Sequence, residues 1–357
     1  FRSEQTMLSY YKNKDNPNFK STNYSINFAS EEDADAAIEQ YKADIMQEGD
    51  EIVDGSETVI YTLQPQASLT VIDQSTGEVK AIVGGRGDKT ASKTLNRATD
   101  TTRQPGSTFK ILAAYSAALD AGGLTLASVQ DDAPYTYAGA NGKSVNNYDR
   151  RYRGFTTLRE AITDSINIVT VKTLAQAGVS LGWQYVQEYG FTTVDSRDMN
   201  EALALGGITQ GVSNLELTAA YAAIANQGTY IKPKFYTKIL DHDGNVLIDN
   251  TTPESHTVIK DTTAWLLTSA MEDVMTSGTG TSAYFGSSMA QAGKSGTTTS
   301  SRDALFAGYT PYYTCAVWGG YDDNAMQKGS DTNYPKRIWK AVRSEERRVG
   351  KECRSRW

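Results

Sequence analysis

The chain has 357 residues, 39% hydrophobic and 22% charged, which is enough apolar sequence for a sizeable core in one large domain or two to three smaller ones. Its net charge of −7 argues against nucleic acid as a partner, because phosphate binding needs a basic surface. The cysteines and histidines have no spacing usual for zinc: Cys315, Cys353, His242 and His256. The sequence contains no apolar run of 18 residues, so it predicts no membrane span. We therefore expect neither a metal nor another cofactor.

Residues 1–57 are predicted to form a linker or pedestal region with one helix. Ser30 can cap this helix, Asp33 occupies its third position, and Gly49 is expected to end it. Its apolar stripe consists of Ala34, Ile38, Tyr41 and Ile45. Because the chain begins with Phe rather than Met, we interpret it as a fragment whose upstream targeting segment is missing.

Residues 58–342 are predicted to form the compact domain. Strand patterns at 68–72 and 78–83 flank a turn at 73–77 and predict a hairpin. Helical patterns occur at 107–119, 158–177, 181–189, 213–226 and 262–275. Further strand patterns occur at 236–240, 245–248, 290–294, 304–309 and 314–321, and a last helix begins in 336–342. Strands at both ends of the domain, with helices between them, favour an α+β fold.

Residues 343–357 differ sharply in composition from the preceding sequence. This segment is rich in Arg and Glu, and the whole string resembles the translation of a common sequencing-adapter read. The alternative is a basic solvated tail, which is the usual meaning of such a charge run. We interpret it as a non-native tail and exclude it from the fold, so the last helix of the domain is expected to be truncated near Val342.

The motif Ser107-Thr-Phe-Lys110 places a hydroxyl and an amine one helical turn apart. A serine needs a base to become a good nucleophile, and a lysine serves as one when burial and a second cation lower its pKa. The spacing alone is weak, since Ser9-Tyr-Tyr-Lys12 has it too. Pro105 and Gly106 strengthen the first motif, because they fix the entry to the helix and allow close approach of backbone.

Two further motifs follow in order. Ser165-Ile-Asn167 comes about 60 residues later, and Lys294-Ser-Gly296 about 130 residues after that. Taken alone, Ser165-Ile-Asn167 is also typical of a polar turn between helices. Lys294-Ser-Gly296 alone is also typical of a strand that ends in a Gly bulge. Together after an S-x-x-K motif, the three predict one shared active site.

The sequence resembles the transpeptidase domain of class A penicillin-binding proteins, within the serine penicillin-binding protein and β-lactamase superfamily. The resemblance covers roughly residues 68–342. Beyond the three motifs, it rests on longer strings: Asn96-Arg-Ala98, Arg103-Gln-Pro-Gly-Ser-Thr-Phe-Lys110, Leu205-Gly-Gly207, Gly211-Val-Ser-Asn-Leu-Glu-Leu-Thr-Ala-Ala-Tyr221, Lys294-Ser-Gly-Thr-Thr298, Arg302-Asp-Ala-Leu-Phe-Ala-Gly-Tyr-Thr-Pro311 and Gly319-Gly-Tyr-Asp-Asp323. It implies a mostly antiparallel sheet flanked by helices, with an additional helical subdomain.

The resemblance also implies the chemistry of the catalytic residues. Ser107 would attack the penultimate D-alanine carbonyl of a peptidoglycan stem peptide and form an acyl-enzyme, and Lys110 would take its proton. Ser165 would relay a proton to the leaving D-alanine, and Asn167 would orient Lys110 and the substrate. An amine of a second stem peptide would accept the acyl group, and β-lactams would acylate the same serine.

The third motif and the residues after it are expected to bind the substrate. Lys294 would supply positive charge, and the Ser295 and Thr297 hydroxyls would hold the terminal carboxylate. Gly296 would let substrate backbone lie along the strand, and Thr298 completes the predicted substrate-binding set. Backbone N–H groups of Ser107 and Thr297 would form the oxyanion hole.

The sequence departs from the family pattern in having Lys-Ser-Gly rather than the commoner Lys-Thr-Gly. The serine at this position still provides a hydroxyl, so function is expected to survive. The glycosyltransferase domain and membrane anchor typical of class A members are not in this chain. We expect a full-length protein anchored at the extracytoplasmic face of the bacterial membrane, with this fragment soluble. The alternatives are a D,D-carboxypeptidase, a β-lactamase-type hydrolase, or a non-catalytic β-lactam sensor.

Overall fold

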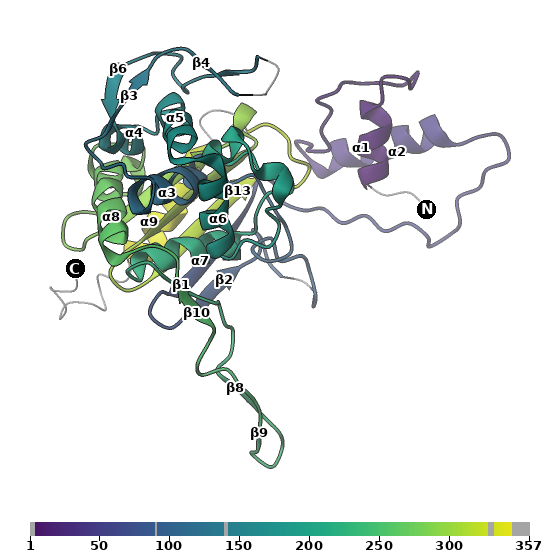
Figure 1. The fold of residues 1–357 in the computed structure, drawn as a ribbon. Coiled ribbons are helices and arrows are strands. Elements are labelled where there is room, and N and C mark those ends of the chain that lie inside the picture. The colour runs from purple at the N-terminus through teal and green to yellow at the C-terminus, as the bar shows by residue number, and fades with distance from the viewer. Residues whose placement is uncertain (1–3, 90, 139–141, 328–331, 345–357) are drawn as a thin grey trace.

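The computed structural model describes residues 4–89, 91–138, 142–327 and 332–344. Its main body is a five-stranded sheet with helices on both faces (Figure 1). The strands are β1 (Gln66–Asp73), β2 (Glu78–Val83), β11 (Ala292–Thr297), β12 (Asp303–Tyr309) and β13 (Thr314–Gly320). Their order is β11-β12-β13-β1-β2, and every neighbouring pair is antiparallel. The two ends of the domain therefore share one sheet, with β11 at an edge.

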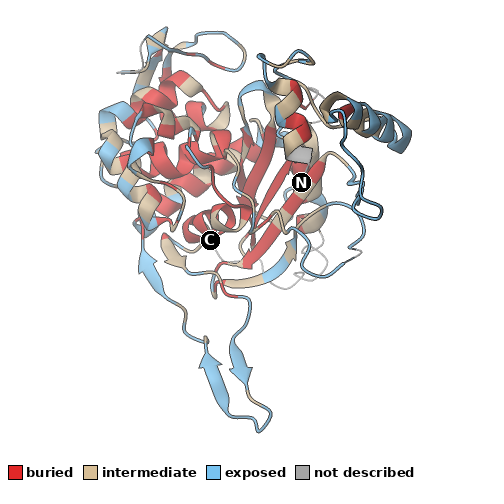
Figure 2. Ribbon diagram, turned by 90° about the vertical axis from the view of Figure 1, so that its right-hand side faces the viewer, coloured by how far each residue is buried: buried red, intermediate tan, exposed pale blue. Residues whose placement is uncertain are grey.

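The two faces of the sheet pack on different helices because side chains alternate along each strand. Thr70 of β1 donates a hydrogen bond to Asn214 at the start of α7 (Asn214–Ala225). Val71 points to the other face and belongs to the apolar cluster around Trp339 of α9 (Tyr334–Ser344). Both faces are thus covered, which matches the almost complete burial of β12 and β13 in Figure 2.

A helical layer lies on the α7 side of the sheet. Its members are α3 (Ser116–Asp120), α4 (Leu158–Thr163), α5 (Asn167–Ala177), α6 (Val179–Glu188) and α8 (Asp261–Thr276). The helical segment η2 (Lys110–Tyr115), in which every residue is buried, contacts α3, α5 and α6 of this layer. Local sequence explains two of the helix starts: Thr157 with Glu160, and Ser213 with Glu216, form capping boxes before α4 and α7.

Short helices and strand pairs complete the described chain. The helical turns are η1 (Gly106–Thr108), η3 (Ser196–Asp198), η4 (Glu201–Leu205), η5 (Thr281–Ala283) and η6 (Thr299–Ser301). The strand pairs are β3 (Val129–Asp132) with β6 (Gly154–Thr157), β4 (Tyr135–Thr136) with β5 (Ser144–Val145), β7 (Thr229–Ile231) with β10 (Ser255–Thr257), and β8 (Lys238–Leu240) with β9 (Val246–Asp249). The β8–β9 hairpin extends away from the body, and all of its strand residues are exposed (Figure 2).

The N-terminal region lies to one side of the body in Figure 1. It contains α1 (Glu4–Lys12) and α2 (Glu31–Ile45), joined by a small core of Met7, Tyr11 and Tyr41. The hydroxyl of Ser25 donates to Asp323 at 2.8 Å and so connects this region to the body. No helix in the described part of the chain is both long and apolar enough for a membrane span.

The α+β fold class is confirmed, and several details of the element predictions are wrong. The helix predicted at 158–177 is broken between α4 and α5, and the N-terminal region has α1 in addition to the predicted helix. That predicted helix ends at Ile45 with an extended Met46, before Gly49. The last helix continues through Arg343 and Ser344, while residues 345–357 of the predicted tail lie outside the described residues.

Candidate active site

Ser107 lies in η1, immediately before η2, so the Ser107-to-Lys110 motif spans a change of helical pitch. Residues Lys110–Tyr115 form a wide π-type turn rather than the α-helix predicted there. Such turns are uncommon and recur at functional sites. Gly106 has φ +54°, a conformation that costs glycine little, and it sets the direction in which the helix begins. Ser107 is partly exposed, whereas Lys110 is fully buried.

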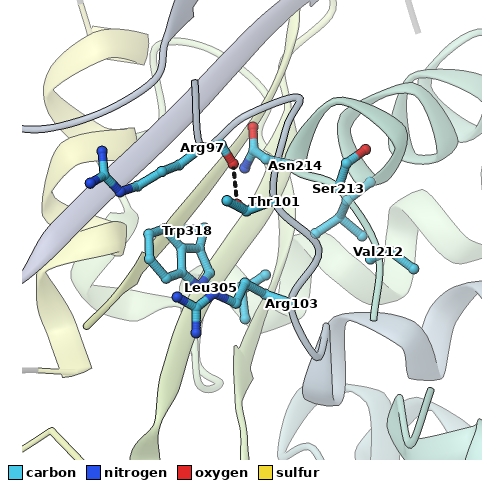
Figure 3. Close-up of a pocket in the computed structure, with 9 residues that line it drawn as sticks. Arg97, Thr101, Arg103, Val212, Ser213, Asn214, Leu305 and Trp318 are labelled. Carbon is cyan, nitrogen blue, oxygen red and sulfur yellow. Dashed lines mark hydrogen bonds between the residues drawn. The ribbon is translucent and has the colours of Figure 1, made fainter. Parts of the chain in front are cut away.

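The segment before the nucleophile is held on both sides, as the close-up in Figure 3 shows. Arg103 and Val212 exchange two backbone hydrogen bonds of 2.9 Å each. The guanidinium of Arg103 stacks over Trp318, 4.9 Å from the ring centroid. The Thr101 hydroxyl donates to the carbonyl of Arg97 at 2.9 Å, marked as the dashed line. The small pocket drawn there is lined by these residues and not by Ser107.

Lys110 is surrounded by three oxygen atoms from the segment between α4 and α5. Its Nζ lies 2.7 Å from the Ser165 carbonyl oxygen, 3.2 Å from Ser165 Oγ and 2.6 Å from Asn167 Oδ1. A neutral lysine amine has two N–H donors and one lone pair. It can therefore donate to the carbonyl and the amide oxygen while its lone pair receives a proton from a hydroxyl.

Ser165 connects the two lysines of the predicted site. It occupies the left-handed region with φ 56°, an uncommon conformation for serine that breaks the helix here. Its Oγ accepts a hydrogen bond of 2.9 Å from Lys294 Nζ and lies within reach of Lys110 Nζ. Lys294 also donates to the Ser295 carbonyl oxygen at 3.0 Å. The three motifs that lie far apart in the sequence therefore meet at one hydroxyl group.

Burial changes the acid–base properties of both lysines. The pKa of Lys110 lies well below 10.5, chiefly because burial penalises the ammonium form and secondarily because Lys294 adds a nearby positive charge. Burial also lowers the pKa of Lys294 to about 7, with a smaller contribution from the charge of Lys336. The pKa of Lys294 thus lies near neutral pH, and the lowered pKa of Lys110 favours the neutral amine that a base for serine requires.

Glycine residues allow β11 to lie directly beside the nucleophile segment. A methyl group at Gly296 would lie 2.6 Å from the Pro105 carbonyl oxygen, and one at Gly106 would lie 3.0 Å from that of Thr297. The backbones of Gly106 and Thr297 are therefore in contact. This arrangement puts the Ser107 and Thr297 peptides, the predicted oxyanion donors, on adjoining segments.

The remaining predicted substrate-binding residues differ in their surroundings. The Ser295 hydroxyl donates to Thr279 at 2.8 Å, which adds Thr279 to the candidate site. The Thr298 hydroxyl instead accepts from the Asp303 N–H at 2.8 Å and so stabilises the turn after β11. Within the described residues, the Ser107 hydroxyl has no protein hydrogen-bond partner. The described residues also contain no cluster of His, Cys, Asp or Glu suited to a metal.

Asn147 and Asp132 were not among the residues predicted from the sequence. Asn147 Oδ1 accepts from the backbone N–H of Asn167, and Asp132 accepts from the Asn147 amide. Asn147 belongs to an adjacent Asn-Asn pair in a polar loop, and no local sequence signal marks Asp132 at the end of β3.

Comparisons with known proteins agree with the predicted family. The family model described as the penicillin binding protein transpeptidase domain matches residues 67–341. Penicillin-binding protein 1F of Bacillus subtilis is 39% identical over 285 residues, covering 78% of this chain and 38% of that protein. Penicillin-binding protein 1A of Clostridium botulinum is 35% identical over 303 residues, covering 81% of this chain and 36% of that protein. The chain thus spans well under half of these relatives.

Solved structures match at the level of the fold. Penicillin-binding protein 1A of Haemophilus influenzae has a TM-score of 0.70 and 26% identity, covering 82% of this chain and 49% of that one. The PonA1 protein of Mycobacterium tuberculosis, solved with penicillin V, has a TM-score of 0.70 and 24% identity, covering 85% and 82% respectively. With the motifs, the fold and the matched family model in agreement, the chain belongs to the penicillin-binding protein transpeptidase family, as its resemblance to class A members predicted.

Proposed function

We propose that this chain is a peptidoglycan D,D-transpeptidase that cross-links stem peptides through an acyl-enzyme on Ser107. The observation that carries the proposal is the shared contact of two buried lysines with the Ser165 hydroxyl, next to the helix start that holds Ser107. This arrangement provides a base, a proton relay and a positive charge without histidine or metal.

The reaction divides into acylation and deacylation. Ser107 Oγ attacks the carbonyl carbon of the penultimate D-alanine, and its proton passes to Lys110. The C–N bond to the terminal D-alanine breaks, and its nitrogen receives a proton through Ser165. The amine of a second stem peptide then attacks the ester and gives a proton to Lys110. The C–O bond to Ser107 breaks, and Ser107 Oγ takes that proton back from Lys110. The chain itself supplies every group for the proton transfers, so no cofactor is needed.

Binding of the donor peptide is assigned to β11 and its surroundings. Lys294, the Ser295 hydroxyl and the Thr297 hydroxyl would receive the terminal carboxylate, and the N–H groups of Ser107 and Thr297 would bind the oxyanion. The hydrogen bond between Ser295 and Thr279 supports extending this group to Thr279. In the full-length protein, the domain would work at the extracytoplasmic face of the bacterial membrane.

The test is intact-mass spectrometry after incubation with a fluorescent penicillin. The wild type should gain one stoichiometric adduct that persists for many minutes, and Ser107→Ala should gain none. Ser9→Ala is the matched control, because Ser9 belongs to the other S-x-x-K sequence, in α1. An adduct that disappears rapidly would favour a β-lactamase-type hydrolase, and a folded wild type without an adduct would overturn the assignment of Ser107.

A stable adduct does not separate a transpeptidase from a carboxypeptidase or a sensor. A second measurement therefore supplies a D-Ala-D-Ala stem peptide with and without an amine acceptor. Cross-linked product supports the proposed function, release of D-alanine with water alone as acceptor indicates a carboxypeptidase, and absence of turnover indicates a sensor.

A further inference from the structure

Helix α5 carries Asn167 at its first position but receives no cap from the residue before it. That residue is Ile166, whose side chain accepts no hydrogen bond. The first N–H groups of a helix have no partner within the helix, so an outside acceptor must satisfy them when they are buried. Asn147 supplies it, since its Oδ1 accepts from the N–H of Asn167 at 3.0 Å and from that of Ile168 at 3.2 Å.

Asn147 is itself held in one orientation. Its side-chain nitrogen donates to both carboxylate oxygens of Asp132, at 2.8 and 3.0 Å, and to the Arg151 carbonyl oxygen at 2.8 Å. An ionised carboxylate only accepts hydrogen bonds, so the Asn147 nitrogen must face Asp132 and its oxygen must face α5. Asn147 is 3% exposed and Asp132 is fully buried, so water does not compete for these bonds.

Asp132 is fixed in turn by Arg153. The Arg153 backbone N–H donates to Asp132 Oδ2 at 2.9 Å, and the guanidinium of the same residue lies 3.9 Å from that oxygen. The positive charge compensates the buried carboxylate.

The same loop also holds the side chain of Asn167. Asn167 Nδ2 donates to the Asn146 carbonyl oxygen at 2.7 Å, which leaves Oδ1 directed at Lys110 Nζ, 2.6 Å away. Backbone and side chain of Asn167 are therefore both set by residues 146 and 147. Ser165, two residues before Asn167, provides the two other oxygens around Lys110.

We propose that Asn147 and Asp132 are positioning residues for acylation of Ser107. Asn147 fixes the start of α5, and Asp132 fixes the orientation of Asn147, so that Asn167 and Ser165 hold the Lys110 amine in one position. This inference rests on the proposed function and adds two residues that touch neither the substrate nor the reacting atoms.

The experiment measures acylation by a fluorescent penicillin at increasing concentration, which separates the maximal acylation rate from the constant for non-covalent binding. The variants are Asn147→Ala, Asn147→Asp, Asp132→Asn and the reciprocal exchange that combines the last two. Asn147→Asp retains an acceptor for α5 but opposes two carboxylates. The exchange restores a donor and an acceptor, because the amide introduced at position 132 can donate to the carboxylate introduced at position 147.

Asn214→Ala is the matched control. Asn214 is a buried amide with two side-chain hydrogen bonds, to Thr70 and to the Ala316 carbonyl oxygen, and it joins α7 to the sheet. Its loss should lower the Tm while leaving the maximal acylation rate within about threefold of wild type. All rates are taken well below the Tm of each variant.

We expect Asn147→Ala and Asn147→Asp to lower the maximal acylation rate by roughly tenfold to a hundredfold, because small displacements of catalytic groups are that costly. Non-covalent binding should change much less, and the exchange should recover most of the rate. A folded Asn147→Ala variant with the wild-type maximal rate would overturn the positioning role. If Asn147→Ala does not fold, the exchange variant decides instead. A folded exchange variant whose maximal acylation rate is no higher than that of Asn147→Asp would also overturn the positioning role.

The outcomes also separate this inference from the function on which it rests. A folded wild type that forms no Ser107 adduct overturns the proposed function. A wild type that acylates normally beside an equally fast Asn147→Ala variant overturns only the role of Asn147 and Asp132.

Discussion

Lys110 and Lys294 share the hydroxyl of Ser165, with Nζ-to-Oγ distances of 3.2 and 2.9 Å. Two protonated amines that are both buried repel each other at such positions, so loss of one proton relieves the repulsion. The surroundings of the two differ, since Lys110 contacts Asn167 and the Ser165 carbonyl oxygen, while Lys294 contacts the carbonyl oxygen of Ser295. This asymmetry supports different roles, with Lys110 as base and the protonated form of Lys294 as the positive charge.

Replacing Lys110 by methionine should slow acylation of Ser107 by roughly a hundredfold to ten-thousandfold, because the serine loses its general base. Methionine has nearly the same length and is well accommodated when buried, so the fold should persist. The rate is measured from adduct formation with a fluorescent penicillin. Lys12→Met is the matched control, as Lys12 ends the other S-x-x-K sequence and lies in α1. A Lys110→Met variant that acylates as fast as wild type would show that Lys110 is not the general base.

Lys294 should make the free energy of unfolding depend on pH. Its pKa is about 7 in the folded chain and 10.5 when unperturbed, so between these values the unfolded chain binds more protons. Stability therefore rises with pH across this window and is lost as pH falls toward 7, by up to about 1.4 kcal/mol per pH unit. Lys294→Met should show a shallower slope in denaturant unfolding between pH 7.5 and about 9.

The control for that measurement is Lys340→Met, which removes an exposed lysine of α9. It should keep the wild-type slope. Equal slopes for wild type and Lys294→Met would mean that Lys294 keeps its proton throughout this pH range in the folded chain.

Gly296→Ala should impair acylation more than its effect on stability explains. The added methyl would lie 2.6 Å from the Pro105 carbonyl oxygen, so β11 must move away from the nucleophile segment. Overpacking of this kind costs about 1–3 kcal/mol. Gly122→Ala is the control. Its methyl would be similarly crowded, 2.9 Å from Ala118 Cα and Ala177 Cβ, but Gly122 lies just after α3 and away from Ser107. The acylation rate and the Tm are measured for both variants. Equal acylation rates in the two variants would contradict the prediction.

Trp339→Ala should destabilise the fold by about 3–5 kcal/mol, the usual cost of truncating a buried aromatic residue. Trp339 is fully buried, packs edge-on against Phe306 at 5.1 Å, and donates to the Cys315 carbonyl oxygen at 3.1 Å. Its loss detaches α9 from the sheet. Trp265→Ala, at a tryptophan that is 62% exposed on α8, should change stability little. Denaturant unfolding compares the two, and similar midpoints would show that α9 contributes little.

Local sequence signals predicted most of the fold. The Ser30 cap, the turn at 73–77 and the regular apolar pattern of α7 depend on neighbouring residues, and the structure confirms each element. The break between α4 and α5 has another origin. Residues 158–177 have a continuous helical pattern, and the left-handed Ser165 is stabilised by contacts with Lys110 and Lys294, 55 and 129 residues away. No local pattern contains that information.

The same distinction applies to the candidate site. Ser107, Lys110 and Lys294 were proposed from short sequence motifs, and the structure brings both lysines to the Ser165 hydroxyl. Asn147 joins a loop to the start of α5, and Asp132 at the end of β3 holds Asn147; neither contact follows from a local sequence pattern. The hydrogen bond between Ser295 and Thr279 likewise joins hydroxyls of separate segments, and no sequence motif predicts it.

The exposed β8–β9 hairpin has a practical consequence. Because every strand residue is exposed, the hairpin adds almost nothing to the hydrophobic core, and its local opening costs little free energy. Its tip at Gly244, where a side chain would meet no neighbouring atom, is therefore the place where a protease should cut first and where the chain should tolerate an inserted sequence. A fluorophore attached there would label the domain without disturbing β11 or the helical turn η1 that contains Ser107.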